Sequence, residues 1–167
     1  SRFEEAKKTL LLLVAAEPDE GRRFALWHEV ARLDEQRLRR PYDASGAYAQ
    51  AALLRPKSPL PALEIARILR AEGDGAKLYD ALMRLAATAA DEGEYARYLF
   101  QAAEVQELML GDDAAARRCL EQADALAHAA RDPALLEAME LIHDRADDGD
   151  ALAALYTRWI ERQPPDA

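Results

Sequence analysis

The chain has 167 residues, a formal net charge of −9 and 50% hydrophobic residues, which is enough for one domain with a substantial core. The acidic balance argues against nucleic acid as a partner, because phosphate binding requires clustered positive charge. Cys119 is the only cysteine. An intrachain disulfide and a cysteine-based metal site are therefore excluded, and we expect Cys119 to be a packed small side chain.

Alanine and leucine dominate the sequence while valine and isoleucine are few, which favours helices over strands. The first apolar run, residues 10–16, is too short to cross a bilayer. It fits the end of a helix better than a signal peptide. We therefore predict an all-α, cytoplasmic protein that makes no membrane contact.

Proline and glycine positions divide the chain into about nine expected helices. They cover residues 2–16, 20–38, 42–54, 60–72, 75–90, 93–110, 113–130, 133–147 and 150–163. The joints are marked by Pro41, Pro56, Pro59, Pro61, Gly93 and Pro133.

A Gly-Asp pair recurs at residues 73–74, 111–112 and 149–150. Large apolar residues recur with a similar period. Leu10, Tyr48, Leu82 and Leu120 are separated by steps of 38, 34 and 38 residues. A period in the thirties predicts an array of helical hairpins, each of which is stabilised by stacking on its neighbours.

The copy that begins at Gly111 shows how one hairpin is built. Gly111 is suited to end a helix in the left-handed conformation, and Asp112 or Asp113 can cap the next helix. Ala116, Leu120 and Ala123 then lie on one helical face and are expected in the core.

The order Ala44, Tyr48, Ala51 and Pro56 resembles the second-helix signature of the tetratricopeptide repeat family. The first-helix signature is largely missing, since Glu104 and Glu107 stand where that family has glycine and tyrosine. The resemblance covers nearly the whole chain. It implies one domain, residues 1–167, forming an α-solenoid of stacked antiparallel hairpins. The unpaired first helix suggests either a segment of a longer array or a cap on this one.

In the family, the first helices of the hairpins line a concave groove that binds peptides or proteins. Projected onto this chain, the partner-binding residues are Arg37, Leu63, Arg67, Arg70, Tyr98, Gln101 and Val105. Arginines beside an aromatic residue suit a partner that carries carboxylates and one apolar anchor. In the alternative interpretation, the arginines only solubilise an exposed face.

The carboxylate clamp of some family members requires paired asparagines, and this chain contains no asparagine. Catalysis and cofactors find no support either. His28, His128 and His143 are far apart in the repeat order, and the acidic run 147–150 lacks the alternating ligands of a calcium loop. We predict no catalytic residue, no cofactor and no metal.

Residues 22–70 carry ten basic and five acidic side chains, whereas residues 71–167 carry nine basic and 21 acidic ones. This asymmetry favours an acidic protein or peptide partner and also permits self-association between the two ends. The leading hypothesis is a non-catalytic protein-interaction scaffold that uses its groove or its ends. The alternative is a structural spacer with no ligand of its own.

Overall fold

The structure of the protein, a computed structural model, describes residues 2–125, 133–145 and 149–161. All regular structure in these ranges is helical, which confirms the predicted all-α class. The chain forms two compact units, unit 1 with residues 1–81 and unit 2 with residues 82–167. Each unit is described by itself.

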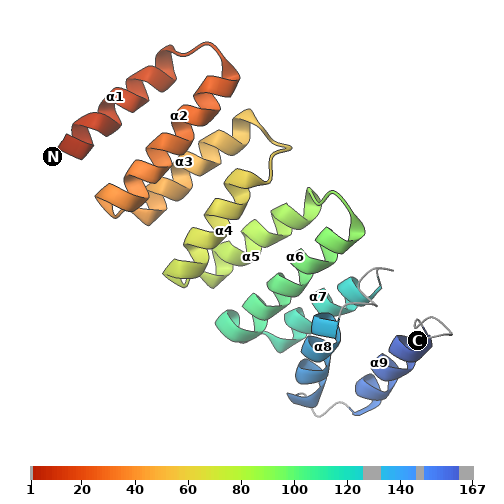
Figure 1. Ribbon diagram of the computed structural model, residues 1–167. Coiled ribbons are helices and arrows are strands. Elements are labelled where there is room, and N and C mark those ends of the chain that lie inside the picture. Colours follow the sequence, from red (N-terminus) through yellow and green to blue (C-terminus); the bar gives the residue numbers. More distant parts are fainter. Residues whose placement is uncertain (1, 126–132, 146–148, 162–167) are drawn as a thin grey trace. The chain divides into compact units, whose positions relative to one another are not determined.

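Unit 1 begins with an antiparallel series of helices (Figure 1). They are α1 (Arg2–Ala16), α2 (Glu20–Leu33), a π-helical turn η1 (Asp34–Leu38), α3 (Pro41–Leu54) and α4 (Leu60–Glu72). Helix α5 (Gly75–Ala87) crosses the boundary at residue 81. Unit 2 continues with α6 (Glu92–Val105), a second π-helical turn η2 (Gln106–Leu110), α7 (Asp113–Asp124), α8 (Pro133–Arg145) and α9 (Gly149–Glu161).

Most predicted helix boundaries are reproduced within two residues, and α1 and α4 have the predicted bounds. One predicted boundary was wrong. Helix α5 ends at Ala87 rather than at residue 90, and the Thr88 hydroxyl donates a hydrogen bond to the Leu85 carbonyl there. Gly93, the predicted first residue of the next helix, lies in the first turn of α6, which begins one residue earlier at Glu92. The end of the helix predicted over 113–130 lies outside the described residues.

The helix caps follow the sequence signals. Gly73 and Gly111 have φ values of 72° and 67° and end α4 and η2 in the left-handed region. The Asp112 side chain accepts a hydrogen bond from the Ala115 backbone N–H at 2.8 Å. Asp91 caps α6 in the same way through the Glu94 N–H. These local contacts confirm that glycine and aspartate set the hairpin joints.

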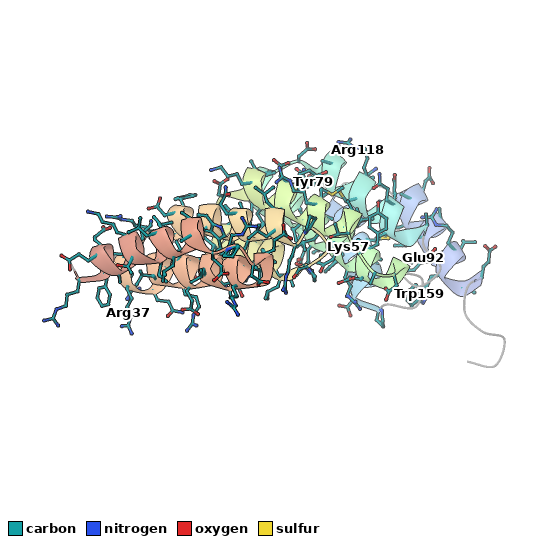
Figure 2. The ribbon with its side chains drawn as sticks, turned by 90° about the horizontal axis from the view of Figure 1, so that it is seen from above. Arg37, Lys57, Tyr79, Glu92, Arg118 and Trp159 are labelled. Atoms are coloured by element: carbon teal, nitrogen blue, oxygen red, sulfur yellow. The ribbon has the colours of Figure 1, made fainter. Side chains whose placement is uncertain are left out.

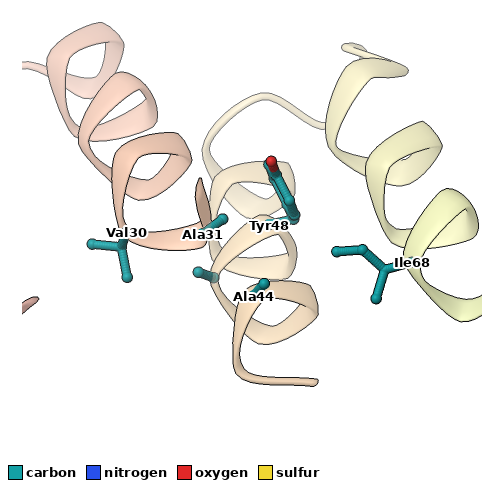
Figure 3. Packing of buried hydrophobic residues seen from close by; sticks show 6 residues of the cluster. Val30, Ala31, Ala44, Tyr48 and Ile68 are labelled. Carbon is teal, nitrogen blue, oxygen red and sulfur yellow. The ribbon is translucent and has the colours of Figure 1, made fainter. Parts of the chain in front are cut away.

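The core of unit 1 centres on Tyr48 of α3, which lies between α2 and α4 (Figure 3). Ala44 and Ala31 allow α2 and α3 to approach closely, and Ile68 closes the cluster from α4. Burying a side chain of the size of Ile68 stabilises the fold by roughly 1.5–3 kcal/mol. The predicted second-helix positions Ala44, Tyr48 and Ala51 are therefore confirmed as core positions.

The core of unit 2 uses the positions that the repeat predicts. Leu82 and Leu85 of α5 are buried, and so are Ala116, Leu120 and Ala123 of α7. Cys119 forms no disulfide and is buried in the same helix, as expected of a packed small side chain. The apolar offsets counted from Gly111 thus mark the buried face of α7.

Helix α1 departs from this scheme, because none of its residues is buried. Leu10 is only partly buried, while its repeat equivalents Tyr48 and Leu120 belong to the core. The physical reason is that α1 packs chiefly on α2 and η1, so much of its surface meets solvent. Leu12 and Leu13 are accordingly exposed.

Candidate functional site

One exposed stripe on α4 carries two of the predicted arginines. Leu60, Leu63, Arg67 and Arg70 are all exposed and are spaced at i, i+3, i+7 and i+10, which places them on one face of the helix. Leu60 is 47% exposed and Leu63 is 42% exposed. We call these four residues the α4 stripe. It offers apolar contact at its N-terminal end and positive charge at its C-terminal end.

Arg67 is already engaged by two carboxylates of unit 1. Its Nη2 donates to Glu35 of η1 at 2.7 Å, and its Nε donates to Glu64 of α4 at 2.9 Å. These hydrogen bonds are the main reason that the pKa of Arg67 is raised. A partner carboxylate would therefore have to compete with Glu35 and Glu64 for this guanidinium.

A hollow of about 280 Å³ lies beside Arg67, between η1, the start of α3 and the C-terminal half of α4. Its charged lining residues are two arginines, Arg39 and Arg67, and two glutamates, Glu35 and Glu72. Because the two signs are balanced, the hollow itself carries no net attraction for an acidic group. The exposed end of the α4 stripe carries the positive charges of Arg67 and Arg70.

Arg37 lies apart from the α4 stripe, although the sequence grouped it with Arg67. Its guanidinium carbon is 5.7 Å from the centre of the Phe3 ring, a cation–π contact between η1 and α1. Figure 2 shows Arg37 at the outer surface of unit 1. Arg37 therefore contacts Phe3 of α1, whereas Arg67 is hydrogen-bonded to Glu35 of η1.

Three predicted groove residues belong to α6 in unit 2, and two of them are in its core. Tyr98 is 7% exposed and Val105 is 3% exposed. Burial, followed by the hydrogen bond from its hydroxyl to Glu94, raises the pKa of Tyr98. Gln101 is partly buried. The side chains of Tyr98 and Val105 thus pack inward in this conformation and do not extend the α4 stripe.

The histidines occupy separate structural positions. The ring of His28 in α2 packs against Phe24 in a tilted arrangement and against Tyr48 edge-on, with ring centroids 4.5 and 5.1 Å away. Burial lowers the pKa of His28. His143 is buried in α8, and His128 lies outside the described residues. Within the described ranges, no three His, Cys, Asp or Glu side chains are placed to hold a metal ion.

Sequence reasoning missed two features of unit 1. Leu60 shares the face of Leu63, and the i, i+3, i+7 spacing from Leu60 was the signal that could have found it. Asp34 is 1% exposed and lies 2.7 Å from the Lys7 ammonium. No local pattern marks that pair, because its two residues come from different helices.

Comparisons with known proteins support the fold. No known family matches the sequence, and no curated protein is similar to it. Several solved structures share the fold. Among them are a crystal structure of MamA (15% identity, TM-score 0.55, covering 96% of this chain and 88% of that one), the MamA RS-1 ArsTM double mutant (16%, 0.58, 96% and 84%) and another crystal structure of MamA protein (14%, 0.54, 96% and 82%).

MamA is a helical-repeat protein of the tetratricopeptide-like kind, so the likeness supports the predicted resemblance at the level of the fold. At 14–16% identity it shows the fold alone. Among the helices described, none is long and apolar enough to cross a bilayer.

Proposed function

We propose that the protein is a non-catalytic protein-interaction scaffold whose α4 stripe binds an acidic segment of a partner protein. The observation that carries the proposal is the exposure of Leu60 and Leu63 next to Arg70 on one face of a first helix. Leucines left in solvent on a helix that also buries Ile68 and Leu69 suit a docking surface.

The stripe favours a partner segment with an apolar anchor followed by carboxylates. The leucines supply the apolar contact, and the arginines supply donors that match carboxylate geometry. A partner carboxylate has to displace Glu35 or Glu64 to reach Arg67. Salt should weaken binding, since the charges are exposed and screened.

The test compares two doubly substituted proteins as baits. Leu63→Ser with Arg70→Glu alters the stripe, and Leu53→Ser with Arg22→Glu makes the same changes at exposed positions of α3 and α2. We expect a partner captured by the parent protein to bind the stripe variant at least tenfold more weakly and the control variant unchanged. Equal binding to both variants would contradict the proposal.

Capture of nothing above background by the parent protein would instead favour a structural spacer. Self-association is separated by sedimentation at low and high salt. Salt-sensitive oligomers of the parent protein that persist in the stripe variant would assign the charge asymmetry to contacts between copies rather than to a foreign partner.

A further inference from the structure

A second hollow in unit 1 has the opposite chemistry to the α4 stripe and shares no residue with it. It measures about 400 Å³ and opens where α1, α2, η1 and α3 meet. Trp27 and Tyr42 give it aromatic walls, Asp34 and Asp43 give it negative charge, and Lys7 reaches in from α1. This volume lies within the range of about 300–1,000 Å³ that ligand pockets occupy.

The carboxylates of the hollow outnumber its cations. The Lys7 ammonium lies 2.7 Å from Asp34 Oδ1 and 3.5 Å from Asp43 Oδ2, so one positive charge is shared by two negative ones. The neighbouring pair of Arg40 and Glu4, at 2.6 Å, is neutral as a pair. The group of Lys7, Asp34 and Asp43 therefore retains one net negative charge.

Asp34 is also incompletely satisfied. It is buried, and neither of its carboxylate oxygens accepts a hydrogen bond of good geometry, although Oδ1 has the Lys7 ion pair. A buried carboxylate normally has several donors, because burying its charge is unfavourable without them. Oδ2 lacks any such donor. The hollow is thus lined by a carboxylate that lacks donors, and a ligand with several N–H groups would supply them.

The rim of the hollow leaves room for a flat group. A Cβ built at Gly46 would meet no atom within 4 Å, so the α3 side is open. Tyr42 is half exposed, and its ring already has the Lys77 ammonium 5.0 Å from its centre. Aromatic rings beside carboxylates suit a guanidinium, which stacks on a ring while donating in its own plane.

We propose that this hollow binds the guanidinium group of an arginine side chain presented by a partner protein. The guanidinium donates to Asp43 at the rim and, once the Lys7 side chain moves aside, to Asp34 Oδ2 below it. Five N–H donors in one plane can serve both carboxylates, whereas a lysine ammonium repeats what Lys7 already supplies. The inference is independent of the α4 stripe, which binds the opposite charge.

The test titrates N-acetyl-arginine N-methylamide into the ¹⁵N-labelled protein and follows amide shifts together with the Trp27 indole. A Trp159→Phe background leaves Trp27 as the single tryptophan, so its fluorescence gives a second readout. We expect saturable changes that are concentrated on residues lining the hollow. N-acetyl-citrulline N-methylamide, which has nearly the same shape without the charge, should bind at least tenfold more weakly.

Two substitutions should weaken binding and one should not. Gly46→Leu fills the open side, and Asp43→Asn removes the rim charge; each should weaken arginine binding at least tenfold. Ala49→Leu places the same side chain at an exposed α3 position outside the hollow, and this variant should bind like the parent protein. Because Gly46 lies within a helix and faces open space, its replacement should preserve folding, which circular dichroism verifies.

Three results would each overturn the proposal. They are the absence of saturable shifts with the arginine probe, equal binding of the citrulline probe, and unchanged binding to the folded Gly46→Leu protein. Equal or tighter binding of N-acetyl-lysine N-methylamide would likewise contradict the specificity for a guanidinium.

Discussion

Residues 34–40 of unit 1 and residues 106–112 of unit 2 form the same kind of turn at the end of a first helix. In each turn, a π-helical segment is followed by a residue in the left-handed conformation. A hydrogen bond between backbone groups six residues apart then closes the turn. The Arg40 N–H donates to the Asp34 carbonyl in unit 1, and the Asp112 N–H donates to the Gln106 carbonyl in unit 2, each with an N···O distance of 2.9 Å. At the end of α4 the corresponding hydrogen bond spans five residues instead of six, because the Asp74 N–H donates to the Leu69 carbonyl at 3.0 Å.

The side chains of the two turns differ at the first, middle and left-handed positions, whereas Glu35 and Leu38 correspond to Glu107 and Leu110. The left-handed residue is Arg39 in unit 1, with φ 57°, and Gly111 in unit 2. The buried first residue is the charged Asp34 in one turn and the neutral Gln106 in the other. The exposed middle is Gln36 and Arg37 in unit 1, but Leu108 and Met109 in unit 2. The two turns thus share one backbone conformation, although the buried first residue belongs to an ion pair in unit 1 and is a neutral side chain in unit 2.

The largest expected effect is at the ion pair. Lys7→Ala leaves Asp34 as a buried charge without its ammonium, so the free energy of unfolding should fall by about 3 kcal/mol, at the low end for a buried pair because Lys7 is partly exposed. Urea unfolding followed by Trp27 fluorescence measures the loss. Lys8→Ala, at the next and exposed position, should change stability by less than about 0.5 kcal/mol.

Neutralising both partners sharpens that comparison. Lys7→Met combined with Asp34→Gln imitates the neutral residue of unit 2 and should lose less stability than Lys7→Ala alone, because no unpaired charge is left buried. A loss as large as that of Lys7→Ala would show that the ion pair is not what distinguishes the turn of unit 1.

The next effect concerns the left-handed glycine of unit 2. Gly111→Ala places a Cβ at φ 67° and should lower the free energy of unfolding by about 1 kcal/mol, although the added atom itself has open space. Denaturant unfolding followed by Trp159 fluorescence in a Trp27→Phe background measures it. Gly111→Asn should lose less, since asparagine tolerates this conformation, and an unchanged midpoint in the alanine variant would contradict the argument.

The reverse change in unit 1 should be smaller and of opposite sign. Arg39→Gly relieves the left-handed strain of a non-glycine residue but increases the entropy of the unfolded chain, so stability should rise by roughly 0.5 kcal/mol. The same urea experiment on unit 1 measures it. Arg40→Gly, one residue outside the left-handed position, should not be stabilising, and a gain there would mean that strain at Arg39 is not the cause.

The smallest effect is a pH dependence in unit 1. Burial lowers the pKa of His28 in the folded protein, while Glu64 and Glu29 oppose the shift. The unfolded chain therefore takes up a proton first as the pH falls below about 6.5, and the stabilisation present above that pH is lost. Unfolding curves between pH 7 and pH 5 should show this decline, and His28→Phe should show less of it. Parallel curves for the two proteins would contradict the assignment to His28.

Several features of the fold were predictable because their causes are local. The helix ends at Gly73 and Gly111 need only a residue that accepts positive φ, and the Asp112 cap needs only a side chain three residues before the N–H that it accepts from. The core positions Ala116, Leu120 and Ala123 follow from helical spacing. Of the predicted site, Leu63, Arg67 and Arg70 were placed together for the same reason.

Tertiary structure decided the rest, because side-chain partners lie across helices that are distant in sequence. Arg67 is paired with Glu35, which is 32 residues away, and Arg37 turns to Phe3 instead. Tyr98 and Val105 are buried on α6, although their spacing alone also fits an exposed face. The burial of Asp34 beneath Lys7 depends on how α1 packs against η1. Helical period thus determined which residues share a face, and only the packing of neighbouring helices decided which faces are covered and which charges are paired.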